Sequence, residues 1–563
     1  MIRTFAPIAL LGLAACTTTS APTATLDIPE IAPGRIDEAA MRAVVERLAS
    51  DQFDGRAPGT PGEALTVAYI TEQFRAAGLQ PGNNGSWTQR VPFVDITGDN
   101  FAPLTIAGGS GSPMQFAYGD DWVGTTYREA PRIDLANSEL VFVGYGINAP
   151  EKGWNDYAGV DMRGKTAVIL VNDPDYATEG LDGPFNGRAM TYYGRWTYKF
   201  EEAARQGAAA ALIIHDTFPA AYSWNVVESS WTGPQVYAQR ADHGASQTMM
   251  NGWVQLPVAE RIARAAGQDL AALRAAAGRQ GFRAVPLGLT ASTSFTNTVR
   301  SFDSQNVIGV LPGREAPEEY VLYTGHWDHL GRCLADASGD DICNGAVDNA
   351  TGIAALVGLA RANAAAGPAR RSQVFLAVTG EESGLLGSDY YAANPVFPLA
   401  QTAGGLNVDA LLPTGRASDV TITGGSKSQL DAFLASALRL EGRTGTAEPT
   451  PERGYYYRSD HFSMAKRGVP MLYIDPGENL EVGGTAAGAA AQADYTENRY
   501  HQPGDEYAPD WNFAGISQQV QLYYRLGRSL AMSRSWPRWN EGDEFRAVRD
   551  ASCAAASANA PSC

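Results

Sequence analysis

The sequence predicts an α/β protein in which a mostly parallel, mixed sheet is sandwiched between helices. Three observations predict this class. From residue 305 onward, short apolar runs alternate with segments of helical periodicity, an order that is typical of parallel sheets. These runs end in loops rich in glycine, aspartate and histidine. Residues 133–285 interrupt the chain with short strand-like runs between Gly, Asp and Pro turns, which indicates a separate, β-rich inserted domain.

Four elements are expected in the part of the sheet domain that precedes the insert. The apolar residues Met41, Val44, Val45 and Leu48 are spaced i, i+3, i+4 and i+7, which predicts a helix. The other three elements are a helix over 68–79 and strands over 88–94 and 104–106.

The alternation of strands and helices follows the insert. The expected strands there span 307–311, 320–324, 374–379, 405–408 and 469–474. The expected helices span 351–365, 385–393, 429–440 and 512–532. Within the insert, strands are expected at 140–143, 166–171 and 209–214, and helices at 198–206 and within 258–282. Ligands of parallel sheets bind beyond the carboxyl ends of the strands, so polar residues there are the first candidates for a functional site.

The patterns divide the chain into segments of different character. The first 16 residues carry one arginine, a short apolar run and small residues before Cys16, which is typical of a secretory signal. The remaining segments are a flexible tether over 17–35, the sheet domain over 36–132 and 286–535, the insert over 133–285, and a C-terminal tail over 536–563. No later segment reaches 18 uninterrupted apolar residues, so no transmembrane helix is expected.

The end of the signal segment predicts where the protein resides. The run Leu13-Ala14-Ala15-Cys16 resembles a bacterial lipobox, which implies cleavage before Cys16 and attachment of lipid to it. The expected product is an exported bacterial lipoprotein, anchored to a membrane and facing the periplasm or the cell surface. Thr17 stands where an inner-membrane retention signal would have aspartate, which favours the outer membrane. A plain signal peptide with an accidental cysteine is the alternative.

The cysteine count fits an oxidising compartment. Apart from Cys16, the chain has two close pairs, Cys333 with Cys343 and Cys553 with Cys563, and we expect each pair to form a disulfide. Their spacing is not that of a Cys-x-x-Cys zinc site. Free thiols are the alternative.

The charge balance argues against one class of partner. The formal net charge is −18, whereas binding of nucleic-acid phosphates requires clustered Lys and Arg. No nucleic-acid partner is therefore expected. The acidic balance otherwise bears on solubility and does not identify a substrate.

Two of the chain's polar runs place an imidazole and a carboxylate at loops near strand ends. His326 ends one expected strand, and Asp328 lies two residues further, on the same side of an extended chain. Asp328 can therefore hold the second ring nitrogen of His326 and fix its tautomer. Asp348 lies in a Gly-rich loop before an expected helix, where a carboxylate can bridge two cations.

Three further runs supply carboxylates and a second imidazole. Glu381 and Glu382 follow a buried strand, and adjacent residues of an extended chain point in opposite directions, so one can coordinate a metal while the other faces water. Asp409 is another anionic ligand, and His501 is the second imidazole, with Asp505 available as its partner. The chain has only six histidines, and two occupy these positions. Two imidazoles and several carboxylates suit a pair of zinc ions with a general base, which implies hydrolysis.

Taken together, these runs resemble the di-zinc exopeptidase family that includes bacterial leucyl aminopeptidase and glutamate carboxypeptidase. The resemblance covers about 36–130 and 290–535. It implies two Zn²⁺ per chain, one held by His326, Asp348 and Asp409 and the other by Asp348, Glu382 and His501. It also implies Glu381 as the general base, Asp328 as the support of His326, and Tyr500 as a donor to the oxyanion. The insert, with Val143-Gly144-Tyr145-Gly146 and the run 156–160, resembles a protease-associated domain, which carries no catalytic residues.

The resemblance implies a peptide substrate, and an aminopeptidase is the first choice. A carboxypeptidase or dipeptidase could use the same site, and a glutaminyl cyclase shares the fold but uses one zinc. A binding module on an inactive peptidase scaffold would typically lack metal ligands that are present here. The run Ser459-Asp460-His461 cannot form a catalytic triad among adjacent residues. With residues 455–457, it is expected to shape the substrate pocket or to be structural. The sequence leaves the oligomeric state open.

Overall fold

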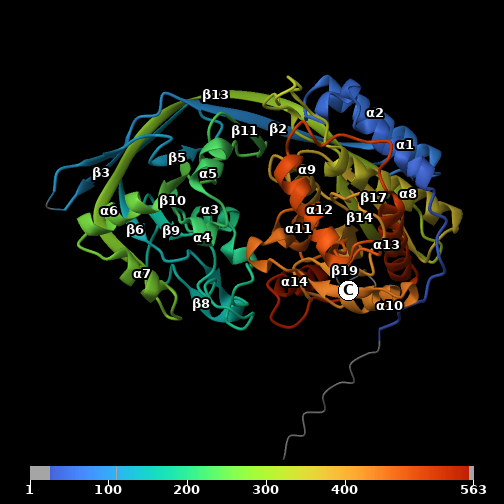
Figure 1. Ribbon diagram of the computed structural model, residues 1–563. Coiled ribbons are helices and arrows are strands. Elements are labelled where there is room, and N and C mark those ends of the chain that lie inside the picture. The colour runs from blue at the N-terminus through green and yellow to red at the C-terminus, as the bar shows by residue number, and fades with distance from the viewer. Residues whose placement is uncertain (1–25, 110, 557–563) are drawn as a thin grey trace, which may run out of the picture.

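Two lobes make up the computed structural model, which describes residues 26–109 and 111–556 (Figure 1). They are joined by two long antiparallel strands, β2 (Thr88–Asp99) and β13 (Val285–Leu311), which run along the upper edge of Figure 1. These strands pair continuously from Thr296 opposite Asp99 to Val307 opposite Thr88. The ribbon that they form therefore sets the position of one lobe relative to the other.

The main lobe contains the predicted mixed sheet, and this fold class is confirmed. Its strands, in spatial order, are β1 (Gln80–Pro81), the end of β13, β17 (Arg371–Val378), β14 (Ala316–His326), β18 (Thr402–Asn407), β21 (Met471–Pro476), β19 (Asp419–Ile422) and β20 (Thr444–Ala447). The four central strands, β17, β14, β18 and β21, are parallel. Strand β19 pairs antiparallel with β21 and parallel with β20.

Helices cover both faces of this sheet. They are α1 (Glu38–Leu48), α2 (Pro61–Ala76), α8 (Gly352–Ala365), α9 (Leu386–Ala393), α10 (Leu430–Glu441), α11 (His461–Ala465), α12 (Gly484–Asn498) and α13 (Ala514–Met532). Alternate residues of β17 point to opposite faces: Phe375 and Ala377 pack with α1, α8 and α13, whereas Val374 and Leu376 pack with α9 and α11. Burial on both faces explains why the middle of such a strand, for example 374–378 of β17, is a continuous apolar run.

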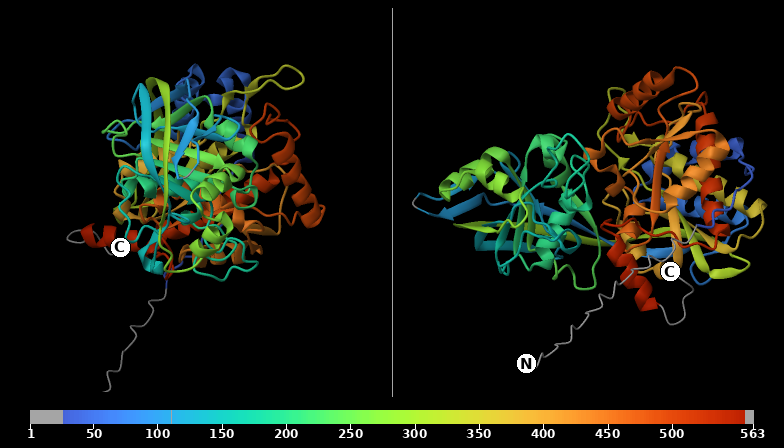
Figure 2. Two further views of the ribbon diagram at one scale, coloured as in Figure 1. Left: turned by 90° about the vertical axis from the view of Figure 1, so that its left-hand side faces the viewer. Right: turned by 90° about the horizontal axis from the view of Figure 1, so that it is seen from below.

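The second lobe, residues 104–295, has its own hydrophobic cores. Its strands are β3 (Leu104–Gly108), β4 (Met114–Phe116), β5 (Trp122–Thr125), β6 (Arg132–Phe142), β9 (Thr166–Leu170), β10 (Ala210–His215), β11 (Pro234–Ala238) and β12 (Met250–Gln255). Its helices are α3 (Trp196–Arg205), α4 (Thr217–Ala220), α5 (Trp224–Trp231), α6 (Leu256–Ala265) and α7 (Leu270–Ala277). Seen from below in Figure 2, this lobe lies beside the main lobe.

The packing of the second lobe begins earlier in the chain than residue 133. Leu104, Ile106, Phe116 and Trp122 are fully or almost fully buried in its core. Strand β3 pairs with the early part of β13, and β5 pairs with β12. These residues therefore pack with the insert and not with the sheet domain over 36–132 to which the sequence analysis assigned them.

The lobes also touch away from the connecting ribbon. Arg188 of the second lobe forms an ion pair of 2.7 Å with Glu452 of the main lobe. The ring of Tyr192 packs edge-on against Phe462, with centroids 5.1 Å apart. The second lobe is thus held against the main lobe by these and other contacts, and a cleft lies between them.

Both ends of the described chain pack on the main lobe. Ile28 and Ile31 lie against its core, so the tether expected over 17–35 does not extend through them. At the other end, Trp539 and Phe545 are buried beside Tyr456, and helix α14 (Arg546–Ala556) follows, so the expected tail is folded at least this far. Among the described residues, no helix has the length and apolar character needed to span a membrane. Cys16 lies outside the described residues.

Two short hairpins complete the structure. Strands β7 (Asn148–Ala149) and β8 (Trp154–Asn155) form one in the second lobe. Strands β15 (Gly331–Arg332) and β16 (Ile342–Cys343) form the other in the main lobe. The second hairpin lies between the residues His326 and Asp348 in the sequence and closes a loop beside the candidate site.

Candidate metal centre

The candidate residues of all five runs come together at one edge of the central sheet. His326 is the last residue of β14, the Glu381-Glu382 pair follows β17, and Asp409 follows β18. These three strands are parallel and in contact, so their carboxyl ends lie at the same edge. Asp348 precedes α8, and His501 follows α12.

Asp348 lies between the two imidazoles. Its Oδ1 is 3.2 Å from Nε2 of His326, and its Oδ2 is 3.4 Å from Nε2 of His501. Nε2 of His326 is also 3.1 Å from Oδ1 of Asp409, and Nε2 of His501 is 3.1 Å from Oε2 of Glu382. The five side chains therefore form two half-sites that share one carboxylate.

The donor atoms fit cations better than they fit hydrogen bonds alone. Each Nε2 faces two carboxylate oxygens, although a ring nitrogen carries at most one hydrogen. Nε2 of His501 makes no well-oriented hydrogen bond to any described residue. One ligand atom each of His326, Asp348 and Glu382 lies within 4.8 Å of the others, as does one each of His326, Glu381 and Asp409. Imidazole nitrogens and carboxylate oxygens at such separations are the ligands of zinc sites.

The negative charges of the clustered carboxylates also favour a bound cation. Burial lowers the pKa of His326, but the charges of Asp409 and Glu381 outweigh it and raise that pKa well above the usual value. His501 behaves similarly, since the charge of Glu382 outweighs burial and raises its pKa to about 10. A cation would replace the protons that the clustered carboxylates otherwise draw to these imidazoles.

Asp328 holds the turn that carries the glutamate pair. Its buried carboxylate accepts hydrogen bonds from the backbone N–H groups of Glu381, at 3.1 Å, and Glu382, at 3.4 Å. Asp328 also contacts His326, but mainly through its backbone: Nδ1 of His326 is 3.1 Å from the backbone oxygen of Asp328 and 3.9 Å from its Oδ1. The chain turns at Asp328, so its carbonyl reaches the imidazole while its side chain reaches the neighbouring strand end.

Glu381 lines the cleft beside the two half-sites. Burial, reinforced by the charge of Glu382, raises its pKa well above that of a free glutamate. A carboxylate with a raised pKa is a stronger base than a free glutamate. The geometry and the pKa together suit a general base.

Tyr500 and His501 form a stacked pair beside the site. Their ring centroids are 3.8 Å apart with an interplanar angle of 25°, and both residues line the cleft. The sequence had suggested that Asp505 supports His501, but in the structure it does not. Its carboxylate accepts the backbone N–H groups of Val347 and Asp348, each at 3.0 Å, because the loop after His501 folds back beneath Asp348.

His329 is a site residue without an assigned role in the sequence analysis. It is buried, and its Nδ1 lies 2.6 Å from Oε1 of Glu382, on the other side of that carboxylate from His501. It follows Asp328 directly, so a second histidine in the same loop was the available signal. Its contact restricts the rotation of Glu382.

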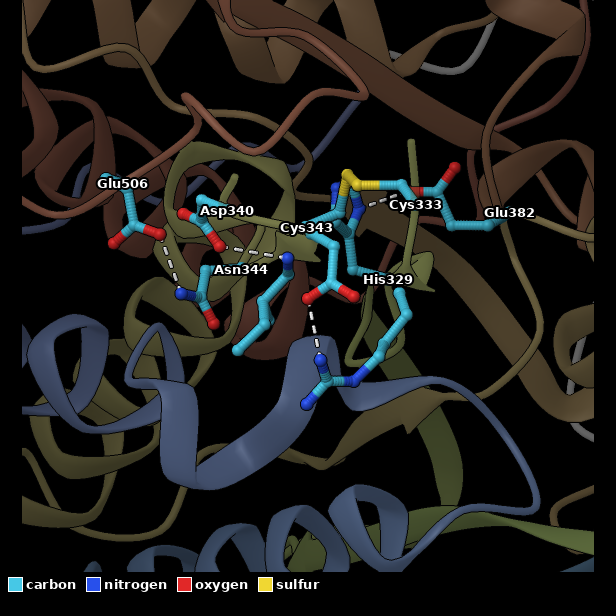
Figure 3. Close-up of a disulfide and its surroundings, with 10 residues drawn as sticks. His329, Cys333, Asp340, Cys343, Asn344, Glu382 and Glu506 are labelled. Atoms are coloured by element: carbon cyan, nitrogen blue, oxygen red, sulfur yellow. Dashed lines mark hydrogen bonds and ion pairs between the residues drawn. A yellow bond between two sulfur atoms is a disulfide. The ribbon is translucent and has the colours of Figure 1, made fainter. Parts of the chain in front are cut away.

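A disulfide closes the loop that follows His329. Cys333 and Cys343 are joined, as predicted, and Figure 3 shows the bond near the contact between His329 and Glu382. Asn344, next to this disulfide, donates a hydrogen bond of 2.6 Å to Glu506 (Figure 3). Residue 563 lies outside the described residues, so the pairing of Cys553 with Cys563 stays a prediction.

Ser459 fixes the orientation of Asp409. Its hydroxyl donates to Oδ2 of Asp409 at 2.7 Å and accepts from the amide of Asn407 at 2.7 Å. Ser459 also lines the cleft, together with Tyr455 and Tyr457, whereas Tyr456, Asp460 and His461 are buried and do not. Residues 455–461 thus contribute to the pocket through Tyr455, Tyr457, Arg458 and Ser459.

Arg56 is a second residue that sequence reasoning missed. It is fully buried, and its guanidinium donates to the carbonyl oxygens of Trp327 at 2.9 Å, Asn344 at 2.6 Å, Gly345 at 2.9 Å and Leu48 at 2.9 Å. It therefore ties the loop after His326 to the loop before Asp348. No local pattern in the sequence signals this role, because every acceptor is a backbone carbonyl.

Replacement of Arg56 by methionine is expected to destabilise the main lobe strongly. Four buried carbonyl oxygens would lose their donor, which should lower the free energy of unfolding by about 3 kcal/mol or more. Urea unfolding followed by tryptophan fluorescence measures the change. Arg90→Met, at an exposed arginine paired with Asp303, is the control and should not shift the midpoint. Overlapping unfolding curves for Arg56→Met and the parent protein would contradict the stabilising role of Arg56 between these two loops.

The metal centre opens into a cavity of about 720 Å³ between the lobes. The main lobe contributes the candidate residues, and the second lobe contributes a facing wall that includes Tyr127, Arg195, Trp196, Tyr237 and Arg240. A ligand at the metal centre would therefore contact both lobes.

The sequence matches known proteins over the part that holds the metal centre. Residues 306–525 match the model of peptidase family M28. The chain is 36% identical over 115 residues to a protein named "Probable zinc metalloprotease" of Pyrenophora teres f. teres, covering 20% of this chain and 24% of that protein. It is 29% identical over 261 residues to Aminopeptidase NAALADL1 of Mus musculus, covering 45% of this chain and 29% of that protein. The chain thus matches about a quarter of the length of these relatives.

A solved structure resembles the chain over a longer stretch. The aminopeptidase from Aneurinibacillus sp. strain AM-1 aligns with 89% of this chain and 95% of its own, at 20% identity and a TM-score of 0.45. The segment matched by the family model contains all five candidate ligands, from His326 to His501, together with the sheet edge that positions them. Residues 306–525, which hold these five side chains, are thus similar to peptidase family M28.

Proposed function

We propose that this protein is a zinc-dependent exopeptidase, an aminopeptidase that releases N-terminal amino acids from peptides. The observation that carries the proposal is the position of Asp348, whose two oxygens face the imidazoles of His326 and His501. One Zn²⁺ would be held by His326, Asp348 and Asp409, and a second by Asp348, Glu382 and His501. Two cations bridged by one carboxylate are typical of hydrolytic sites.

The match to a family model and the relatives' names support the choice of reaction. Family M28 is a peptidase family, and two relatives are named as a zinc metalloprotease and an aminopeptidase. The cleft beside the site is closed on one side by the second lobe, and such a wall suits the end of a peptide better than its middle.

Each polar group of the site has a task in hydrolysis. Bound zinc supplies Lewis-acid activation of the scissile carbonyl and of water. Glu381 takes the proton from the attacking water and delivers it to the leaving amine. The hydroxyl of Tyr500 donates to the oxyanion as it develops. Asp328 holds the turn on which Glu381 stands, so that the base keeps its position.

Paired substrates test the proposed activity. Leucine p-nitroanilide, which has a free amino group, is expected to be hydrolysed, whereas its N-acetyl derivative is not. Treatment with 1,10-phenanthroline should abolish turnover, because the chelator removes the metal, and added zinc should restore it. The release of nitroaniline is followed at 405 nm.

Other outcomes would indicate an activity other than that of an aminopeptidase. Hydrolysis of an N-blocked dipeptide without hydrolysis of the nitroanilide would indicate a carboxypeptidase or dipeptidase. Cyclisation of an N-terminal glutamine, with one zinc per chain, would indicate a glutaminyl cyclase.

We further infer the setting of the enzyme from its sequence. The run before Cys16 supports an exported lipoprotein anchored in a bacterial membrane, with the outer membrane favoured. The runs at 143–146 and 156–160 support a protease-associated type of domain for the insert. In that arrangement the second lobe would form a wall of the substrate cleft without supplying catalytic groups.

A further inference from the structure

Two carboxylates outside the metal centre line the same cleft. Asp475 lies near the end of β21, opposite Thr421 of β19. Glu448 follows β20 directly, on the other side of β19. Both residues line the cavity that contains Asp409. The outer edge of the sheet therefore carries a second, separate group of acidic side chains.

Glu448 is buried but incompletely paired. Only 9% of its surface is exposed, and its Oε2 accepts the backbone N–H of Gly424 at 3.0 Å. Its Oε1 has no hydrogen-bond partner among the described residues. A buried carboxylate oxygen without a donor is costly, so a ligand that brings a donor would be bound favourably.

Asp475 is also without a cationic partner. Its Oδ2 accepts the hydroxyl of Thr423 at 2.5 Å, and no ion pair between described residues includes it or Glu448. Burial raises the pKa of Asp475 to about 6 and that of Glu448 to about 7, and the neighbouring charges that raise them further, those of Asp409, Asp475 and Glu452, are negative. A positive group of a ligand would relieve both effects.

The sheet topology shows where the two carboxylates lie relative to the metal centre. Strands β18 and β21 are parallel neighbours, with Asn407 paired with Tyr473, so Asp409 and Asp475 each lie two residues beyond the same pair. Glu448 follows β20, which lies two strands beyond β21, about 10 Å further across the sheet at the usual strand spacing. The acidic group thus extends outward from the metal centre.

We propose that Glu448 and Asp475 form a subsite that binds the cationic side chain of a lysine or arginine at the N-terminus of the peptide. The inference rests on the proposed aminopeptidase function. The α-amino group of a bound peptide is next to the scissile carbonyl and stays at the metal centre. Only a long side chain reaches from there past Asp475 toward Glu448, and lysine and arginine end in the donors that these carboxylates lack.

Matched nitroanilides test the subsite. The substrates are those of arginine, of citrulline, its uncharged isostere, and of leucine. We expect the parent enzyme to have a kcat/KM for arginine that is about tenfold or more above that for citrulline. Glu448→Gln and Asp475→Asn should each lower the value for arginine by about 10-fold or more while changing those for citrulline and leucine by less than about threefold. Glu478→Gln, at another carboxylate that lines the cleft, is the matched control and should preserve the ratio.

The three substrates separate the possible outcomes. An equal loss for all three in both variants would show that the carboxylates bind the α-amino group, and a parent ratio of arginine to citrulline near one would also overturn the proposal. Thermal midpoints confirm that each variant is folded. Hydrolysis of the leucine substrate reports the proposed function independently of the subsite.

A binding measurement covers the case in which no nitroanilide is hydrolysed. Calorimetric titration of the protein with argininamide and with citrulline amide compares the cation with its neutral isostere without turnover. Tighter binding of argininamide, lost in Glu448→Gln, supports the subsite even if the proposed function fails. Equal binding of the two amides contradicts the subsite.

Discussion

Replacement of Glu381 by glutamine is expected to remove nearly all turnover while preserving the metal content and the fold. Glutamine has the shape of glutamate but cannot accept a proton from water. The loss of a positioned general base should lower kcat by about 10²–10⁴-fold. The fold should persist because Asp328 bonds the backbone of residue 381, and that contact does not depend on the side chain.

Three measurements on the same preparation make this result interpretable. These are kcat on the best substrate, zinc per chain by plasma mass spectrometry, and the thermal midpoint. Glu382→Gln is the informative comparison, since it changes the adjacent residue of the same turn but removes a proposed ligand, and it should lose zinc as well as activity. A kcat near that of the parent enzyme in Glu381→Gln would refute the role of the base.

Asp348→Asn is expected to lose bound metal and, with it, activity. The carboxylate of Asp348 faces both imidazoles, and a neutral amide offers one oxygen and no charge to share between two cations. Removal of a residue that merely supports a ligand typically costs 10–100-fold in affinity, so loss of the shared ligand should cost more than about 100-fold. Zinc content after dialysis, and activity at increasing zinc concentrations, measure the effect.

A matched surface change controls for the loss of one negative charge. Asp494→Asn, at an exposed aspartate of α12 that pairs with Arg499, should keep the zinc content and activity of the parent. Two tightly bound zinc ions per chain in Asp348→Asn would count against a bridging role.

That the candidate ligands would come together at one site could be predicted, because each belongs to a local pattern. His326, Glu382 and Asp409 follow apolar runs that form β14, β17 and β18, and the parallel order of these strands brings their ends together. Asp348 and His501 lie in loops whose approach to this edge is set by α8 and α12. The fold class and the residue types of the site were therefore predictable from the sequence.

The orientation of supporting groups was not predictable, because it depends on backbone turns. Asp328 lies closer to His326 through its carbonyl than through its carboxylate, and Asp505 binds the backbone of Val347 and Asp348 instead of His501. Arg56 binds carbonyl oxygens far away in the sequence, and no local pattern signals such contacts.

The full length of the strands that connect the lobes could not be predicted from periodicity either. Strand β13 was expected only at its end, 307–311, but it begins at Val285 because its earlier half pairs with β6 and β3 of the second lobe. Helix α2 begins at Pro61, before the expected residue 68, since proline is favoured in the first helical turn. Long-range pairing and turn chemistry, not apolar spacing, decide these boundaries.

Anomalous diffraction at the zinc edge, from crystals of the zinc-loaded protein, shows directly whether Asp348 joins two metal ions. We expect two peaks per chain that share Asp348 as a ligand, one beside His326 and Asp409 and the other beside Glu382 and His501. Peaks that are not coordinated by Asp348, or the absence of a peak at this edge of the sheet, would contradict the bridging role of Asp348.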